Sequence, residues 1–83
     1  TNMNKIITQT INDKILGMYQ TTLVGFDNEE KNGVEHISAT IQTGDNITSN
    51  DIDIMKTALN KRLDKNVDLT VEIITLNVYN SAG

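Results

Sequence analysis

The sequence predicts a single α+β domain, residues 1–83, with the element order α-β-β-α-β. Three observations lead to this prediction. Two segments repeat apolar residues at helical spacing, and three others alternate or are rich in β-branched residues. The dipeptide Asn32-Gly33 is a strong hairpin signal, because both residues tolerate a positive φ, and it separates two of the strand-like segments.

The predicted helices span residues 3–20 and 49–65. Apolar side chains of the first fall within about 120° of one another on a helical wheel; they are Met3, Ile7, Ile11, Ile15 and Met18. Those of the second fall within about 80°; they are Ile52, Met55, Leu59 and Leu63. Asn66 suits the position just beyond the second helix. Each helix therefore has one face that must be buried.

The predicted strands span residues 21–27, 34–43 and 67–79, and residues 28–33 form a polar loop between the first two. The second strand alternates clearly, with Ile37, Ala39 and Ile41 on one face. In the third strand the apolar parity changes after Ile73 and continues at Ile74, Leu76 and Val78. Either a β-bulge restores the register, or the distal half is apolar on the opposite face.

These elements predict a three-stranded sheet with both helices on one face, a ferredoxin-like arrangement built on a split β-α-β unit. We expect the third strand to lie beside the first, which gives the strand order 2-1-3. The alternative order is 1-2-3. The connection through the second helix should be right-handed.

Composition excludes several classes of function. The net charge is −4, and the only basic cluster is Lys61, Arg62 and Lys65, so we expect no nucleic-acid binding. No run of about 18 apolar residues is present, so we expect no membrane span within this chain. There is no cysteine, which excludes disulfides and thiolate metal sites and agrees with a cytosolic location.

The segment "TGDNITSNDIDIM", residues 43–55, is the densest group of oxygen ligands in the chain. An EF-hand calcium loop needs alternating ligands, a central glycine and a closing glutamate, and this segment has none of these. Thr48 with Asp51, or Ser49 with Asp53, instead fits a hydroxyl cap at the start of the second helix. Asp45, Asp51 and Asp53 remain candidate metal ligands under the alternative of weak cation binding.

His36, the only histidine, lies on the polar side of its strand. We interpret it as a surface residue, and as a candidate metal ligand only if other groups join it. Asp68 or Glu72 on the same outer face are the available partners. No catalytic motif or phosphate-binding loop is present. The sequence therefore predicts a protein that is not an enzyme and has no cofactor.

The face of the sheet opposite the helices must meet water or a partner. Ile74, Leu76, Val78 and Phe26, together with Val24, are predicted to form an apolar interface patch there. The alternative is local burial by a bulge or a twist. Because open sheets commonly self-associate, we expect a homodimer.

The stretch "ISATIQTGDNITSNDIDIMKTALNKRLDKNVDLTVEII" resembles the region after the membrane helices in the bacterial "uncharacterised hydrophobic domain" family of integral-membrane proteins. The whole element order is also similar to the cytoplasmic C-terminal domain of cation diffusion facilitators, which dimerises and senses metal ions through histidine and acidic residues. The single histidine of this chain departs from that pattern.

Both resemblances imply a non-catalytic domain on the cytoplasmic side of the bacterial inner membrane, which serves dimerisation or regulation beside an adjoining membrane-spanning domain. The alternatives are a small self-standing homo-oligomeric interaction protein, and an enzyme subunit whose site is shared between protomers and uses His36 with Asp68 or Glu72.

Overall fold

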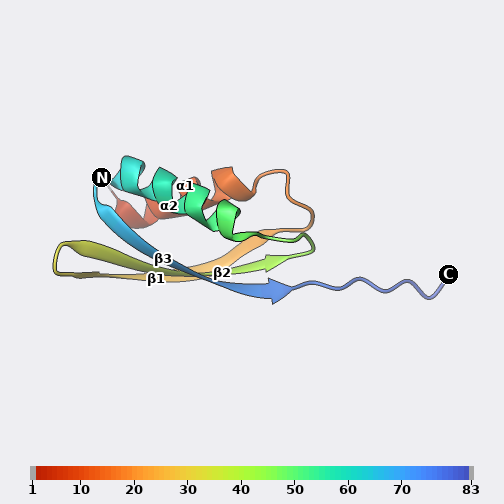
Figure 1. Cartoon of the computed structure of the whole chain (residues 1–83). Helices are drawn as coiled ribbons and strands as arrows, with labels where there is room; N and C mark the ends of the chain where they lie inside the picture. The colour runs from red at the N-terminus through yellow and green to blue at the C-terminus, as the bar shows by residue number, and fades with distance from the viewer. Residues whose placement is uncertain (1, 83) are drawn as a thin grey trace.

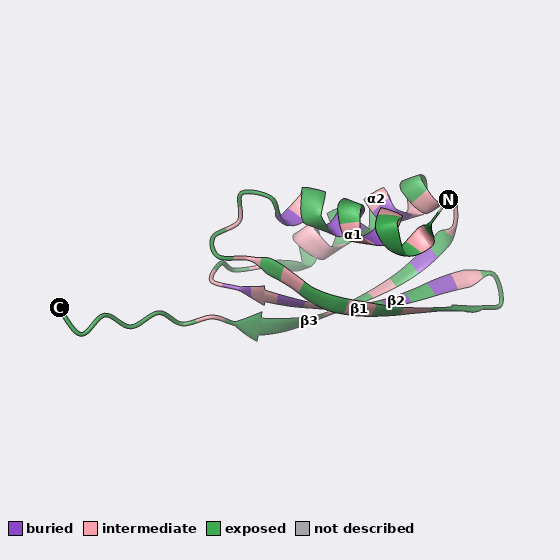
Figure 2. Cartoon of the chain, turned by 180° about the vertical axis from the view of Figure 1, so that it is seen from behind, coloured by how far each residue is buried: buried purple, intermediate pink, exposed green. Residues whose placement is uncertain are grey.

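The computed structural model describes residues 2–82, which form two helices and a three-stranded sheet (Figure 1). Both helices lie on one face of the sheet in two opposite views (Figure 1, Figure 2). The predicted α+β, ferredoxin-like class and the order α-β-β-α-β are confirmed. The elements are α1 (Met3–Ile15), β1 (Thr22–Lys31), β2 (Val34–Thr43), α2 (Ser49–Leu63) and β3 (Asn66–Thr75).

The helices begin where predicted and end earlier. A turn closed by the Met18 N–H on the Ile15 carbonyl, at 3.0 Å, follows α1, and Gly17 has a φ of +87° that leaves the helical region. At the end of α2, Asp64 adopts the left-handed conformation, and its N–H donates to the Asn60 carbonyl. The left-handed residue is therefore Asp64, and Asn66, predicted to follow the helix, instead begins β3.

The β1–β2 hairpin is longer than the sequence predicts. Asn32 and Gly33 both have positive φ, +51° and +79°, and Lys31 pairs directly with Val34. A two-residue turn of this kind requires its flanking residues to pair, so the polar residues 28–31 continue β1. The prediction of a loop over these residues is wrong.

The strand order is β1-β2-β3, with β1 antiparallel and β3 parallel to β2. The preferred order 2-1-3 is wrong, and the alternative 1-2-3 is correct. The physical reason is that β2 suits the central position of the sheet better than β1 does. Alternate residues of β2, from Glu35 to Thr43, are buried, whereas β1 ends in charged residues that suit a sheet edge.

The core lies between the helices and the inner face of the sheet. α1 and α2 present their apolar stripes to the central strand β2, whose Ile37 and Ile41 are almost completely buried. The buried apolar residues are Ile7, Ile11, Ile15, Ile37, Ala39, Ile41, Met55, Leu59 and Val67. No helix within residues 2–82 is long and apolar enough to cross a membrane.

Candidate functional site

The last strand is shorter than predicted: β3 ends at Thr75, so the extension of the strand to residue 79 is wrong. Of the predicted interface residues, Ile74 lies at the end of β3, and Leu76 and Val78 follow it. β3 pairs with β2 in an unbroken register, without a bulge, and Ile74 pairs with Gln42 on the face away from the helices. Ile74 is 44% exposed and Val78 is 65% exposed. Leu76 is half-buried, and its N–H donates to the Thr43 carbonyl at 2.7 Å. The ladder contains no bulge, so Ile74 lies on the open face as the second alternative predicted, whereas Leu76 and Val78 lie beyond the strand.

Phe26 does not lie on the open face, and this part of the prediction is wrong. It pairs with Ala39 and packs against the core from the helix side. The cause is a register shift between Leu23 and Gly25, which places Val24 as an extra residue in β1. Val24 is 58% exposed, whereas Leu23 and Phe26 share the inner face.

The rest of the open face is polar. Glu29, His36 and Asp68 stand in register across the three strands, and His36 Nδ1 lies 3.1 Å from Asp68 Oδ2. Asp68, rather than Glu72, is thus the partner of His36; the Thr40 hydroxyl lies 3.4 Å from Glu72. In the described part of the chain, no group of three or more histidine and carboxylate side chains is placed to hold a metal ion.

The carboxylates of Asp45 and Asp51, in the acidic segment of residues 43–55, accept hydrogen bonds from backbone N–H groups. Asp51 Oδ2 accepts the Thr48 N–H at 2.9 Å, and Thr48 Oγ1 accepts the Asp51 N–H at 3.2 Å, a complete capping box for α2. Asp45 accepts the N–H groups of Tyr19 and Asn46 through its two oxygens. Asp53 is exposed on α2. These contacts favour the capping interpretation of the segment.

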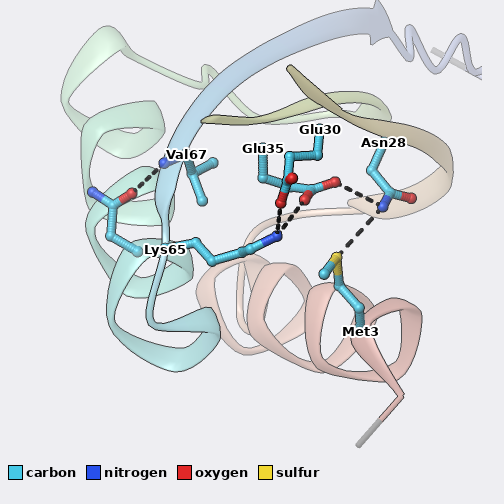
Figure 3. A network of polar contacts seen from close by, with 7 residues as sticks. Met3, Asn28, Glu30, Glu35, Lys65 and Val67 are labelled. Carbon is cyan, nitrogen blue, oxygen red and sulfur yellow. Dashed lines mark hydrogen bonds and ion pairs between the residues drawn. The ribbon is translucent and has the colours of Figure 1, made fainter. Parts of the chain in front are cut away.

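A buried carboxylate at the hairpin end of the domain was not singled out from the sequence. Glu35 is 2% exposed and lies on the helix-facing side of β2. Its Oε2 accepts a hydrogen bond from Asn28 at 3.0 Å, and its Oε1 accepts one from Lys65 at 3.0 Å (Figure 3). Lys65 also contacts Glu30 at 2.5 Å, and the Asn28 amide reaches the sulfur of Met3.

The hydrogen bond from Asn28, followed by the contact with Lys65, lowers the pKa of Glu35 despite its burial. Contacts with Glu30 and Glu35 raise the pKa of Lys65. The pair is therefore ionised near neutral pH. The alternation of β2 contained the signal, because Glu35 shares the parity of Ile37, Ala39 and Ile41.

A groove of about 740 Å³ runs along the outer side of the helix layer. Ile54 and Ala58 of α2 contribute its apolar part, and Lys14, Lys61 and Arg62 contribute its basic part. Ile54, which lies outside the predicted stripe of α2, is 45% exposed there. An ion pair with Asp13, at 2.7 Å, holds Arg62 against α1.

No protein-family model matches this chain. No curated protein matches it either. A search of solved structures found a likeness to the MamB CTD magnetosome protein of Desulfamplus magnetovallimortis BW-1, with a TM-score of 0.63 and 11% sequence identity. The likeness covers 96% of this chain and 100% of that chain. It shows a shared fold. The comparisons give no support to the hydrophobic-domain family.

Proposed function

We propose that this chain is a cytoplasmic accessory domain of a bacterial transporter-like membrane protein and that it acts by self-association or regulation rather than by catalysis. The likeness to the MamB CTD over almost the whole chain supports this proposal. In this proposal the partners are a second copy of the domain and the membrane-spanning domain of the same protein.

The observation that carries the self-association is the apolar distal end of β3. Ile73, Ile74, Val78 and Tyr79 are between 40% and 89% exposed. Ile73 and Ile74 lie at the end of β3, and Val78 and Tyr79 lie in the segment that follows it. A concentration of apolar side chains in water is typical of a protein interaction surface.

Analytical ultracentrifugation tests the self-association. We expect a dimer in the wild type and a monomer after Leu76→Asp, because a charge at the interface cannot be buried without a partner. A matched pair sharpens the test. Ile74→Asp should also yield a monomer, whereas Ile54→Asp, at a residue of nearly equal exposure on α2, should leave the dimer intact. A monomeric wild type would contradict the proposal.

The membrane association is tested by the reading frame of the complete gene. We expect segments of about 18 or more apolar residues outside the 83 residues described by this sequence. Their absence would instead favour a self-standing homo-oligomeric interaction protein. The proposal of self-association would then stand, and the proposal of a transporter-like membrane protein would not.

An enzyme subunit with a site shared between protomers is a second candidate, favoured by one observation. His36 and Asp68 contact each other on the open face, as a general base and its orienting carboxylate would. Any activity of the purified dimer should then disappear in His36→Ala while the dimer persists. Activity that survives this substitution would exclude the candidate.

A further inference from the structure

The outer edge of β3 has no neighbouring strand. β3 is the last strand of the sheet and pairs only with β2. Along a strand, the N–H and C=O groups of one residue point to one side, and those of the next residue point to the other side. The Leu76 N–H donates to Thr43 of β2, so residues of even number face β2. The N–H and C=O groups that point away from the sheet belong to Leu69, Val71, Ile73 and Thr75.

The first outward N–H of β3 is satisfied within the chain, and the following ones are not. Asn60 Oδ1 of α2 accepts the Val67 N–H at 2.8 Å. Within residues 2–82 we find no comparable acceptor for the outward N–H groups from Leu69 to Thr75. Backbone groups at a sheet edge are a template for an added strand. The edge is therefore open over the distal two thirds of β3.

This edge also lacks the features that protect the opposite one. β1 has a bulge after Leu23 and carries charges near its outer end, at Asp27, Glu29, Glu30 and Lys31. Charges and bulges block the addition of a strand. β3 has an unbroken ladder, and no residue from Ile73 to Ala82 is charged. The two edges of the sheet therefore differ in their capacity to accept a strand.

Residues 76–80 supply a strand of the required kind. They continue from β3 as an extended segment that leaves the body of the domain (Figure 1, Figure 2). We propose that this segment of one copy pairs antiparallel with the open edge of β3 of a second copy. The same segment of the second copy pairs with β3 of the first, and the two copies are related by a two-fold axis at Thr75. This pairing rests on the self-association proposed above and specifies its geometry.

The chemistry of the edge selects a second copy as the occupant. With the axis at Thr75, Ile74 faces Leu76 of the second copy and Val71 faces Tyr79 of the second copy, which gives two apolar pairs on each side of the axis. Ile73 faces Asn77 of the second copy. Glu72 faces Val78 of the second copy, so no like charges are opposed in this segment. The two Thr75 residues face each other as a hydrogen-bonded pair, because the backbone groups of both point outward.

Cross-linking tests the axis. The chain has no cysteine, so a single substitution reports one contact. Cα atoms of a hydrogen-bonded antiparallel pair lie about 5.5 Å apart, within the range of a disulfide. Under mild oxidation, Thr75→Cys should become mostly a covalent dimer on a non-reducing gel. Thr22→Cys, an exposed threonine on the other edge strand, is the matched control and should stay monomeric on that gel.

Proline substitution tests the backbone hydrogen bonds independently. The outward N–H of Thr75 takes no part in the β2 ladder, so Thr75→Pro spares the fold and removes one hydrogen bond from each half of the dimer. The dissociation constant should rise by about tenfold or more. Asn80→Pro is the control, because its N–H points away from the second copy in this register, and it should leave the constant unchanged.

The outcomes separate the two proposals. A dimer that cross-links through Thr75→Cys and weakens in Thr75→Pro supports the edge pairing. A wild-type dimer that does neither overturns the edge pairing and leaves the self-association in place on another surface. A monomeric wild type over the concentration range of the experiment overturns both.

Discussion

Lys65 Nζ lies 3.0 Å from Oε1 of the buried Glu35, and it thereby joins the α2–β3 junction to the β1–β2 hairpin. The same ammonium contacts Glu30 of β1, so one side chain links β1 and β2 to the residue that precedes β3 (Figure 3). The side chain of Glu35 is 3% exposed and that of Lys65 is 28% exposed. A carboxylate this deeply buried depends on its partners to offset the loss of hydration.

Removal of the ammonium should destabilise the domain. Lys65→Met leaves the Glu35 carboxylate buried with Asn28 as its remaining partner, so the free energy of unfolding should fall. Lys61→Met, at an exposed lysine of α2, should have little effect. The double variant Lys65→Met with Glu35→Leu should recover much of the loss, because the buried charge is then absent. Urea denaturation measures all four proteins, and equal midpoints would contradict the prediction.

Glu35 should also give the domain an acid-dependent stability. Its pKa in the folded state lies below its ordinary value of 4.5, so its stabilising contribution is present above pH 4.5 and is lost as pH falls through the lower, folded value. The difference in unfolding free energy between wild type and Glu35→Gln should therefore shrink from about pH 6 to about pH 3. Denaturation curves across this range test it, and a constant difference would assign the acid sensitivity to other carboxylates.

The capping box at the start of α2 should have a measurable energetic effect. Thr48→Ala removes the acceptor of the Asp51 N–H and should cost about 0.5–2 kcal/mol of stability. Ser49→Ala, one residue later and outside the box, should change stability by less than about 0.5 kcal/mol. Thermal unfolding followed by circular dichroism gives both values. Similar losses in the two variants would argue against the box.

Gly33 in the hairpin turn and Gly25 in β1 should respond oppositely to substitution by alanine. A Cβ at Gly33 or at Gly25 would contact nothing within 4 Å, so the two positions differ in backbone conformation rather than in space. Gly33 has a φ of +79°, and Gly33→Ala should cost about 1–2 kcal/mol. Gly25→Ala should be neutral or should stabilise by up to about 1 kcal/mol. Equal effects would mean that φ does not determine the cost.

Weak cation binding at Asp45, Asp51 and Asp53 is tested by calorimetry with calcium, magnesium and zinc. Asp45 and Asp51 already accept backbone N–H groups, so we expect no affinity tighter than about millimolar. Micromolar binding that is lost in Asp45→Asn would overturn the capping interpretation of this segment.

The fold class followed from local patterns because each pattern acts within one element. Helical spacing places Ile7 and Ile11 on one face of α1, and alternation places Ile37 and Ile41 on one face of β2, before any tertiary contact forms. Thr48 and Asp51 are three residues apart, so the start of α2 could also be predicted locally. The extent of β1 could not, because residues 28–31 become a strand only by pairing with β2.

The sequence by itself thus determined the number, type and order of the helices and strands, where α2 begins, and that apolar residues follow Ile73 at the end of the last strand. Only the tertiary structure decided the strand order, the burial of Glu35 beside Lys65, and the inward position of Phe26. Each of these depends on register between segments that are distant in the chain, and one extra residue at Val24 is enough to reverse a face. The register between strands is set by strand pairing and core packing together, so it cannot be predicted from the sequence of one segment.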